Sequence, residues 1–495
     1  MSGVEADDRR LARETAKVGV NVGLLLAARI AGLAMSLVQI GLIFRALSLS
    51  GQGEFQAAFN FASLFTVFAT LGIQRLLVRD IARNPGAAWP QVWTALSVVG
   101  VLSALCMAAM YLVKRESGTH DVVLWAGSYV VVCWAFQQPF EALLIARERM
   151  GLVAFLSILG GAIRLLAVWR WVPMPGPVPD FVVPPLYAHQ VLAAANFAAL
   201  GCVVFAAFAI GGAEFPRFRP RAALDQIREC FPFFLAMLCS WVYFKSDMEL
   251  LHHFRGSRDA GIYAPVQKLT EPLLMIAALW GTAIFPALCR LSHTDTAGFT
   301  HVKATSLRLA LLVACPMAVG LALLAEPIIL LLAGGGDGLL ESARVLQIVS
   351  LILPLFYLNG IGQEFLYASG RNAYVVWTYF CAAVASVGLN LWAIPAYGVI
   401  GLAWVAVGAN LLVSVLFCIG MRREIAFGNL AQLLWRTAIA CGFMGAVALY
   451  GASFNLYLGV AGGIVVYLGV QAALGTLEPA ERAMIRQVVL RRLEA

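Results

Sequence analysis

The chain has 495 residues, of which 61% are hydrophobic and 13% are charged. Soluble domains contain roughly 45–50% apolar and about 25% charged residues, so water cannot be the solvent for most of this surface. This composition excludes a soluble enzyme, a disordered protein and a disulfide-stapled scaffold. The net charge of +8 comes from basic residues in short loops, and no basic stripe interleaved with aromatic residues suggests nucleic-acid binding. We therefore expect a polytopic membrane protein.

The ten cysteines and six histidines show no spacing typical of metal ligands. The cysteines lie in or beside apolar runs and form no CxxC motif, which is typical of small buried hydrophobic residues rather than of disulfides. We expect no metal site and no bound cofactor, and an ion that couples to transport, either a proton or sodium, is the one small partner left open.

Apolar runs follow one another along the chain, each long enough to cross a bilayer of about 30 Å as a helix. They are continuously apolar, whereas the strands of a membrane barrel alternate, so the runs predict helices. The expected fold is all-α, with fourteen spans at about 18–44, 54–73, 91–113, 122–146, 151–171, 187–210, 230–251, 261–289, 306–333, 345–368, 374–395, 398–420, 431–451 and 456–474.

Arginine and lysine accumulate in alternate segments, beginning with the N-terminal one. Such residues are enriched in cytoplasmic loops, so both termini are expected in the cytoplasm. The opposite loops carry fewer basic residues, namely Arg45, Lys114, Arg115, Arg255 and Arg258.

Two stretches of sequence echo one another across the halves of the chain. Gly53, before Phe55, and Gly261, before Tyr263, both follow a basic loop and open a helix, and Glu141 has a counterpart in Glu364. Two six-span lobes of like orientation explain these echoes, with chance similarity between apolar helices as the alternative. The predicted organisation is an N-terminal segment (1–17), a first lobe (18–210), a linker (211–229), a second lobe (230–420), two further spans (431–474) and a tail (475–495).

Two arginines lie deep inside predicted spans. Ionisable groups there cost about 2.5–3.5 kcal/mol on insertion scales and usually face protein or a water-filled cavity. Arg29 and Arg164 have no acidic residue at i±3 or i±4, and the repeat places Asn390 within one helical turn of the position opposite Arg164. Because arginine donates two hydrogen bonds to phosphate oxygens, these three residues are candidates for binding an anionic headgroup. The alternative is a structural arginine bonded to carbonyl groups or to an acid on another helix.

A second group of charges begins the second lobe. Its spacing allows Lys245 to pair with Glu249, and Lys268 with Glu271, on the same helix. These residues, together with Asp247 on the other face, are interpreted either as a fixed salt-bridge network or as a gating or ion-coupling site. Near the inner ends of their spans, Glu141 and Glu364 are expected to pair with loop arginines or, alternatively, to act at an inner gate.

Several motifs resemble those of the lipid-linked oligosaccharide flippases, the Wzx-type polysaccharide transporters of the multidrug/oligosaccharidyl-lipid/polysaccharide exporter superfamily. The resemblance covers about residues 15–425. Its most specific parts are Arg79-Asp80-Ile-Ala-Arg83 and Asn390-x-x-x-Ile394-Pro395-x-Tyr397-Gly398; further parts are Arg45 to Phe55, Gly72-Ile73, Asp247, Gly261 to Glu271, and Phe285-Pro286.

Membership of this family implies a transporter in the bacterial inner membrane, not an enzyme. It implies that undecaprenyl-pyrophosphate-linked glycans move to the periplasmic leaflet by alternating access between two lobes. The partners implied are the lipid-linked glycan, membrane lipids, and a polysaccharide polymerase with its chain-length machinery. The alternatives are a related exporter of lipid-linked peptidoglycan precursor or of cationic drugs, and the two deep arginines argue against a cationic cargo.

Overall fold

The fold is all-α in the computed structural model. The structure describes residues 28–84, 86, 88–115, 120–147, 149–173, 183–211, 220–294, 296–334, 338–421 and 428–475, and no strand occurs within these ranges. The predicted N-terminal segment, residues 212–219 of the linker and the tail beyond residue 475 lie outside them. The described chain divides into two compact units: unit 1 comprises residues up to Ala264 with Leu332–Gly334, and unit 2 comprises Pro265–Leu331 and the residues from Gly335 onward.

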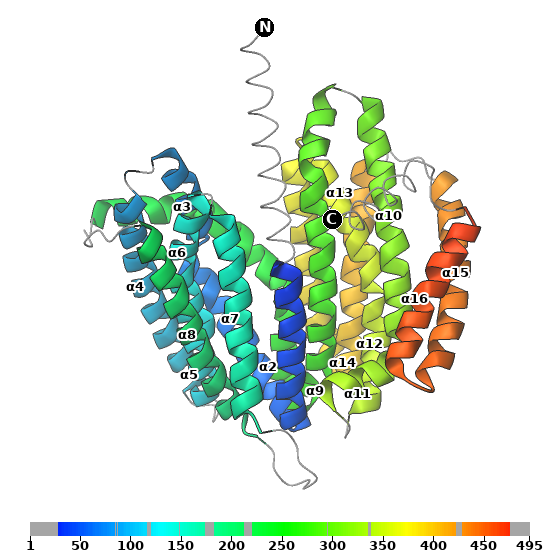
Figure 1. Ribbon diagram of the computed structural model, residues 1–495, viewed down its shortest axis with the longest axis horizontal. Coiled ribbons are helices and arrows are strands. Elements are labelled where there is room, and N and C mark those ends of the chain that lie inside the picture. Colours follow the sequence, from blue (N-terminus) through cyan, green and yellow to red (C-terminus); the bar gives the residue numbers. More distant parts are fainter. Residues whose placement is uncertain are drawn as a thin grey trace. The chain divides into compact units, whose positions relative to one another are not determined.

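Unit 1 is a helical bundle whose members are visible in Figure 1. Its first described helix is Ala28–Ala46. The helices that follow are α2 (Leu49–Thr70), α3 (Ile73–Arg83), α4 (Ala88–Lys114), α5 (His120–Gly127), the π-helical segment η2 (Ser128–Cys133), α6 (Trp134–Ala146), α7 (Met150–Trp171), α8 (Pro185–Gly211) and the first part of α9 (Pro220–Thr294).

Unit 2 contains the remainder of α9 and the later helices. These are α10 (Thr296–Leu323), α11 (Ala325–Ala333), α12 (Leu339–Ser350), α13 (Ile352–Ala368), α14 (Asn372–Met421), α15 (Gly428–Ala452) and α16 (Leu456–Ala473). A core that includes Ala277, Ala314 and Tyr357 joins α9, α10 and α13. The last two helices pack on one another and on α10, where the hydroxyl of Tyr467 donates to the carbonyl of Leu312 at 2.7 Å.

Two of the long helices are each two spans joined at a glycine. α9 changes direction at Gly256 (φ 78°, ψ −171°), and α14 does so at Gly398 (φ 60°, ψ −140°). Both conformations lie at positive φ, where a side chain would be strained. The chain therefore turns between spans without a loop at these two points.

Ten helices in the described chain are long and apolar enough to cross a membrane. This set counts the two halves of α14 once, and it leaves out α2 and both halves of α9. With those helices added, the described ranges contain the fourteen spans that the sequence predicts, in the predicted order. The all-α membrane fold is thus confirmed.

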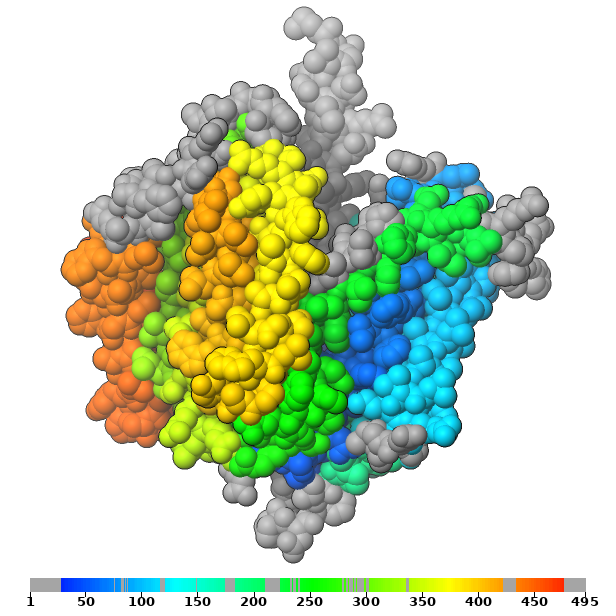
Figure 2. All heavy atoms as spheres, turned by 180° about the vertical axis from the view of Figure 1, so that it is seen from behind, coloured from blue at the N-terminus to red at the C-terminus, as the bar shows by residue number. Residues whose placement is uncertain are grey.

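The outward faces of the spans are apolar, as a lipid-facing surface requires. α14, yellow to gold in Figure 2, leaves Trp377 and Trp392 each 63% exposed and Trp404 54% exposed. Its opposite side buries small and polar residues. Apolar residues therefore occupy both sides of the helix and only a few polar ones are buried, which explains why the apolar periodicity is weak in such a span.

Repeat and packing divide the chain at different points. The predicted second lobe begins at residue 230, whereas unit 1 continues to Ala264, because the first half of α9 packs along the helices before it. Trp241 donates to Ser63 of α2 at 2.9 Å, and Phe68 and Phe234 have ring centroids 5.2 Å apart. The predicted lobes describe sequence repetition, and they remain a prediction.

Candidate functional site

Unit 1 gathers polar side chains at the end where α3 lies. α3 begins after Leu71 and Gly72, both in left-handed conformation, which turn the chain sharply out of α2. One face of α3 is fully buried through Ile73, Leu76 and Ile81. The amphipathic α3 thus covers the end of the bundle and directs Gln74 inward.

The carboxylate of Glu141 is the centre of this polar group. It accepts a hydrogen bond from Gln137 at 2.5 Å, one turn earlier on α6, and another from Gln74 at 3.3 Å. Arg29 lies within electrostatic range of the same carboxylate. Glu141 is five residues before the end of α6, hence about 7.5 Å from that end. The group therefore occupies the part of unit 1 nearest α3.

Within the described residues, amide side chains contact the two glutamates that were expected to pair with loop arginines, and that pairing stays a prediction. Glu141 has the glutamine partners just described. In unit 2, Glu364 accepts from Gln363 at 3.3 Å, while the nearby loop arginine, Arg371, donates to the carbonyl of Gly420 at 2.6 Å. An amide side chain donates to each carboxylate, and Arg29 adds an electrostatic interaction at Glu141. Their gating role stays a prediction.

Arg164 extends from α7 into a space made by small residues. A Cβ on Gly160 would lie 3.5 Å from its Nη1, and a Cβ on Gly161 would lie 3.9 Å from its Nη2. Gly161 also receives Met35 of the helix Ala28–Ala46, so this helix, which carries Arg29, packs directly on α7. The two arginines predicted from the sequence therefore come from neighbouring helices.

Neither a hydrogen bond nor an ion pair to Arg164 is present within the described ranges, although its side chain is only partly accessible. It lies 14 residues into α7, about 21 Å from the start of that helix. Arg29, beside Glu141, lies much nearer the α3 end. The pair thus provides positive charge at two depths of unit 1, and Arg164 has a guanidinium whose donors remain available for an anion.

The third headgroup candidate, Asn390, belongs to unit 2. It is 1% exposed in α14, and in the described structure its Oδ1 has no hydrogen-bond partner. Elsewhere in unit 2, Asn359 donates to the carbonyl of Asn410 at 3.1 Å and accepts from Ser414 at 2.7 Å, which connects α13 to α14. Sequence reasoning selected Asn390 and missed this network.

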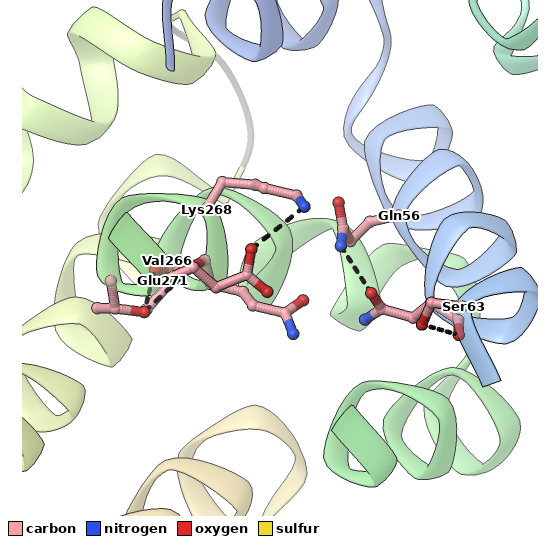
Figure 3. Close-up of polar contacts among 8 residues, drawn as sticks. Gln56, Ser63, Val266, Lys268 and Glu271 are labelled. Carbon is pink, nitrogen blue, oxygen red and sulfur yellow. Dashed lines mark hydrogen bonds and ion pairs between the residues drawn. The ribbon is translucent and has the colours of Figure 1, made fainter. Parts of the chain in front are cut away.

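The charged residues of α9 that the sequence singled out contact partners on α4 and on α9 itself. Glu249 pairs with Lys114 of α4 at 3.8 Å, a partner that sequence spacing could not reveal. Asp247 accepts from the hydroxyl of Tyr263 at 2.7 Å. Lys268 and Glu271 form the i, i+3 ion pair that their spacing allows, at 3.4 Å (Figure 3).

α2 carries a polar row of its own. Gln56 donates to the side chain of Asn60 at 3.1 Å, and Ser63 donates to the main-chain carbonyl of Asn60 at 2.7 Å (Figure 3). Gln56 and Asn60 are completely buried. The spacing of these two amides, one helical turn apart, is the only sequence signal for this polar row. Amide residues occur throughout the chain, so the spacing alone did not identify the row.

The Arg-Asp-Ile-Ala-Arg motif lies on α3, with Arg79 exposed and Ile81 buried. Arg79 forms ion pairs with Asp80 at 2.7 Å and with Glu229 of α9 at 2.6 Å. Hydrogen bonds to these two carboxylates raise the pKa of Arg79 above its usual value. The motif therefore attaches α3 to the beginning of α9.

No group of three or more metal-binding side chains is found in the described ranges.

Two family models match the chain over more than half its length each. The first is described as "Polysaccharide biosynthesis protein" and matches residues 18–292. The second is described as "Lipid II flippase MurJ" and matches residues 191–468. No curated protein sequence matches the chain.

Solved structures of membrane transporters share the fold at low sequence identity. A lipid II flippase MurJ in an inward closed conformation is 14% identical, with a TM-score of 0.70 over 92% of this chain and 98% of that one. An inward-facing MATE-family multidrug transporter is 14% identical, with a TM-score of 0.61 over 81% and 98%. An outward-facing MATE structure is 13% identical, with a TM-score of 0.57 over 82% and 95%.

Proposed function

We propose a transport function for this chain, which belongs to the polysaccharide biosynthesis protein family and to the flippase-like part of the multidrug/oligosaccharidyl-lipid/polysaccharide exporter superfamily. Its cargo is an undecaprenyl-pyrophosphate-linked oligosaccharide, moved from the cytoplasmic to the periplasmic leaflet of the bacterial inner membrane by alternating access. Movement of the lipid requires no covalent chemistry. The glycan product then becomes available to a polysaccharide polymerase and its chain-length machinery.

The observation that carries this proposal is the guanidinium of Arg164. Burying a charge without a partner is costly, so a protein retains one where a ligand supplies the opposite charge. A pyrophosphate offers the oxygen acceptors that match the planar fork of arginine. Arg29, which interacts electrostatically with Glu141, lies nearer the α3 end than Arg164 does. It gives the headgroup a second cationic contact as the lipid moves through unit 1.

An alternative proposal is that the chain transports a lipid-linked peptidoglycan precursor. Support comes from the second family model, which covers residues 191–468. Both cargoes share the undecaprenyl-pyrophosphate group, so the arginines suit either one, and the attached sugar distinguishes them. By contrast, a cationic drug would be repelled by Arg164.

The test is a translocation assay on the purified full chain in phospholipid vesicles. A fluorescent undecaprenyl-pyrophosphate oligosaccharide reports its leaflet through an impermeant quencher. Arg164→Met removes the charge and keeps the apolar stem. Since a charged hydrogen bond contributes about 1.5–3 kcal/mol, translocation is expected to slow roughly 10- to 150-fold.

The matched control is Arg170→Met on the same helix, at an exposed position near its end. It should translocate at the parent rate. Equal rates for the Arg164 and Arg170 variants would contradict the proposal. A parallel assay with the peptidoglycan precursor decides between the two cargoes, since the preferred substrate is the one that moves faster at equal concentration.

A further inference from the structure

The two glycines of the sequence repeat lie against one another in unit 1. A Cβ on Gly53 of α2 would overlap the carbonyl oxygen of Ser257, and a Cβ on Gly261 of α9 would overlap the carbonyl oxygen of Leu49. Ser257 precedes Gly261 by four residues, as Leu49 precedes Gly53. The contact is therefore reciprocal, with the backbone of each helix resting on the glycine of the other, as in close crossings of small residues in membranes.

A small cavity with titratable walls lies beside this crossing. It has room for about one water molecule and is lined by Glu54 and Phe61 of α2, Lys114 of α4, Val123 of α5, and Glu249 and His252 of α9. Glu54 follows Gly53 directly. His252 shares a hydrogen bond of 3.3 Å with Ser257, the residue whose carbonyl rests on Gly53. The cavity and the crossing thus use the same short segments of α2 and α9.

The charges of the cavity do not balance without a proton. Its two carboxylates come from opposite helices, and Lys114 provides one positive charge, 3.8 Å from Glu249 and 4.8 Å from the centre of the Phe61 ring. With His252 neutral the cavity has a charge of −1, and one added proton makes it neutral. Glu249 also has a buried Oε2 without a hydrogen-bond partner in the described structure, which is an available position for that proton.

The charged residues around the cavity do not change its net charge of −1. On α9, His253 is exposed beside His252, Lys245 lies one turn before Glu249, and Arg255 pairs with Asp259 at 3.9 Å. On α5, Asp121 is in the first turn and exposed. None of these five lines the cavity.

We propose that Glu54, Lys114, Glu249 and His252 form a proton-binding site that controls the Gly53–Gly261 crossing. With the proton bound, Lys114 and the added proton compensate both carboxylates, and α2 and α9 stay in contact. When the proton leaves, Glu54 and Glu249 both carry a negative charge in the cavity that they line, and the repulsion between them is poorly screened away from water. The crossing then loosens. Within the proposed transport function, this would link proton release to opening at this end of the bundle.

The test measures the crossing itself, without substrate. Spin labels are attached at Ser50→Cys and Phe254→Cys, two exposed positions on either side of the crossing, in the full chain freed of its native cysteines. Distances are measured by electron–electron resonance in lipid nanodiscs between about pH 5 and about pH 9, a range that brackets the unperturbed carboxyl and imidazole groups. The parent should shift to longer distances as the pH rises.

Two variants remove one carboxylate each. In Glu54→Gln and Glu249→Gln the cavity is neutral without a proton, so the short distance should persist at every pH and the shift should be lost. Glu326→Gln changes an exposed carboxylate in the first turn of α11, and it should keep the parent shift. The short distance in all variants at low pH shows that they are folded.

A parent distance that is independent of pH would overturn the proposal, as would a shift that survives in both carboxylate variants. A shift that follows sodium concentration at constant pH would overturn it too, by assigning the site to a metal cation. Because no glycan is present, these results are independent of the translocation assay. If translocation fails while the pH-dependent shift in distance remains, the proposed cargo is rejected. If translocation succeeds and the distance does not depend on pH, the proton site is rejected.

Discussion

Arg164 and Glu249 show how a single residue in the membrane is defined by its partners. Both are ionisable and lie inside spans, but Glu249 has Lys114 at 3.8 Å while the guanidinium of Arg164 is cradled by the glycines of its own helix. The glycines matter because any side chain at Gly160 or Gly161 would occupy the space around the guanidinium. An available charge of this kind indicates a ligand, whereas a paired one indicates structure or control.

At the same scale, Asn359 is expected to contribute to stability. Asn359→Leu removes the acceptor of Ser414 and the donor to Asn410 within a buried network. A buried polar group left without its partner costs about 1–3 kcal/mol. We expect the unfolding free energy in detergent to fall by this amount, and the double variant with Ser414→Ala to lose less than the sum of the two single variants. Strict additivity in this double-mutant cycle would contradict the network.

At the scale of helices, the breaks at Gly256 and Gly398 join spans directly. Their positive φ values are reached easily by glycine alone, and strained backbone of this kind costs about 1–3 kcal/mol per residue. Gly256→Ala and Gly398→Ala should therefore each lower the unfolding free energy by roughly that amount. Around Gly256 no atom lies within 4 Å of the added Cβ, so its penalty would come from the backbone alone.

Gly388 is the control for these two variants. It lies within the first half of α14, and no atom lies within 4 Å of a Cβ added there. Since alanine favours a helix over glycine by about 0.5–1 kcal/mol, Gly388→Ala should leave stability unchanged or raise it. Chemical or thermal unfolding measures all three variants, and equal effects at the three glycines would reject the role of positive φ.

The helices were predictable from the sequence because continuous apolar runs are a local property. Their ends were less so: α2 begins at Leu49 and not near residue 54, because Ser48 caps it by accepting from the backbone N–H of Gly51 at 3.1 Å. The breaks of α9 and α14 depend on one residue each. Arg29 and Arg164 were selected by their predicted depth alone, and the structure places only Arg164 far from the α3 end. The roles of Lys114 and Gln74 depend on which distant helices touch, and one sequence does not contain that information.

For the molecule as a whole, the distribution of basic residues predicts the sides of the membrane. Ser50 should face the periplasm and Asn372 the cytoplasm, and both positions are exposed. In a variant without native cysteines, an impermeant maleimide added to intact cells should label Ser50→Cys, and it should label Asn372→Cys after the membrane is opened and not before. The opposite pattern would invert the predicted topology.

The direct test of the proposed function follows lipid-linked saccharide in cells that lack this chain and any redundant flippase. We predict that undecaprenyl-linked glycan accumulates in the cytoplasmic leaflet and that polymer disappears from the cell surface. The parent chain should restore both properties, and Arg164→Met should restore little. Normal surface polymer with normal lipid-linked pools in the deletion strain would contradict the account.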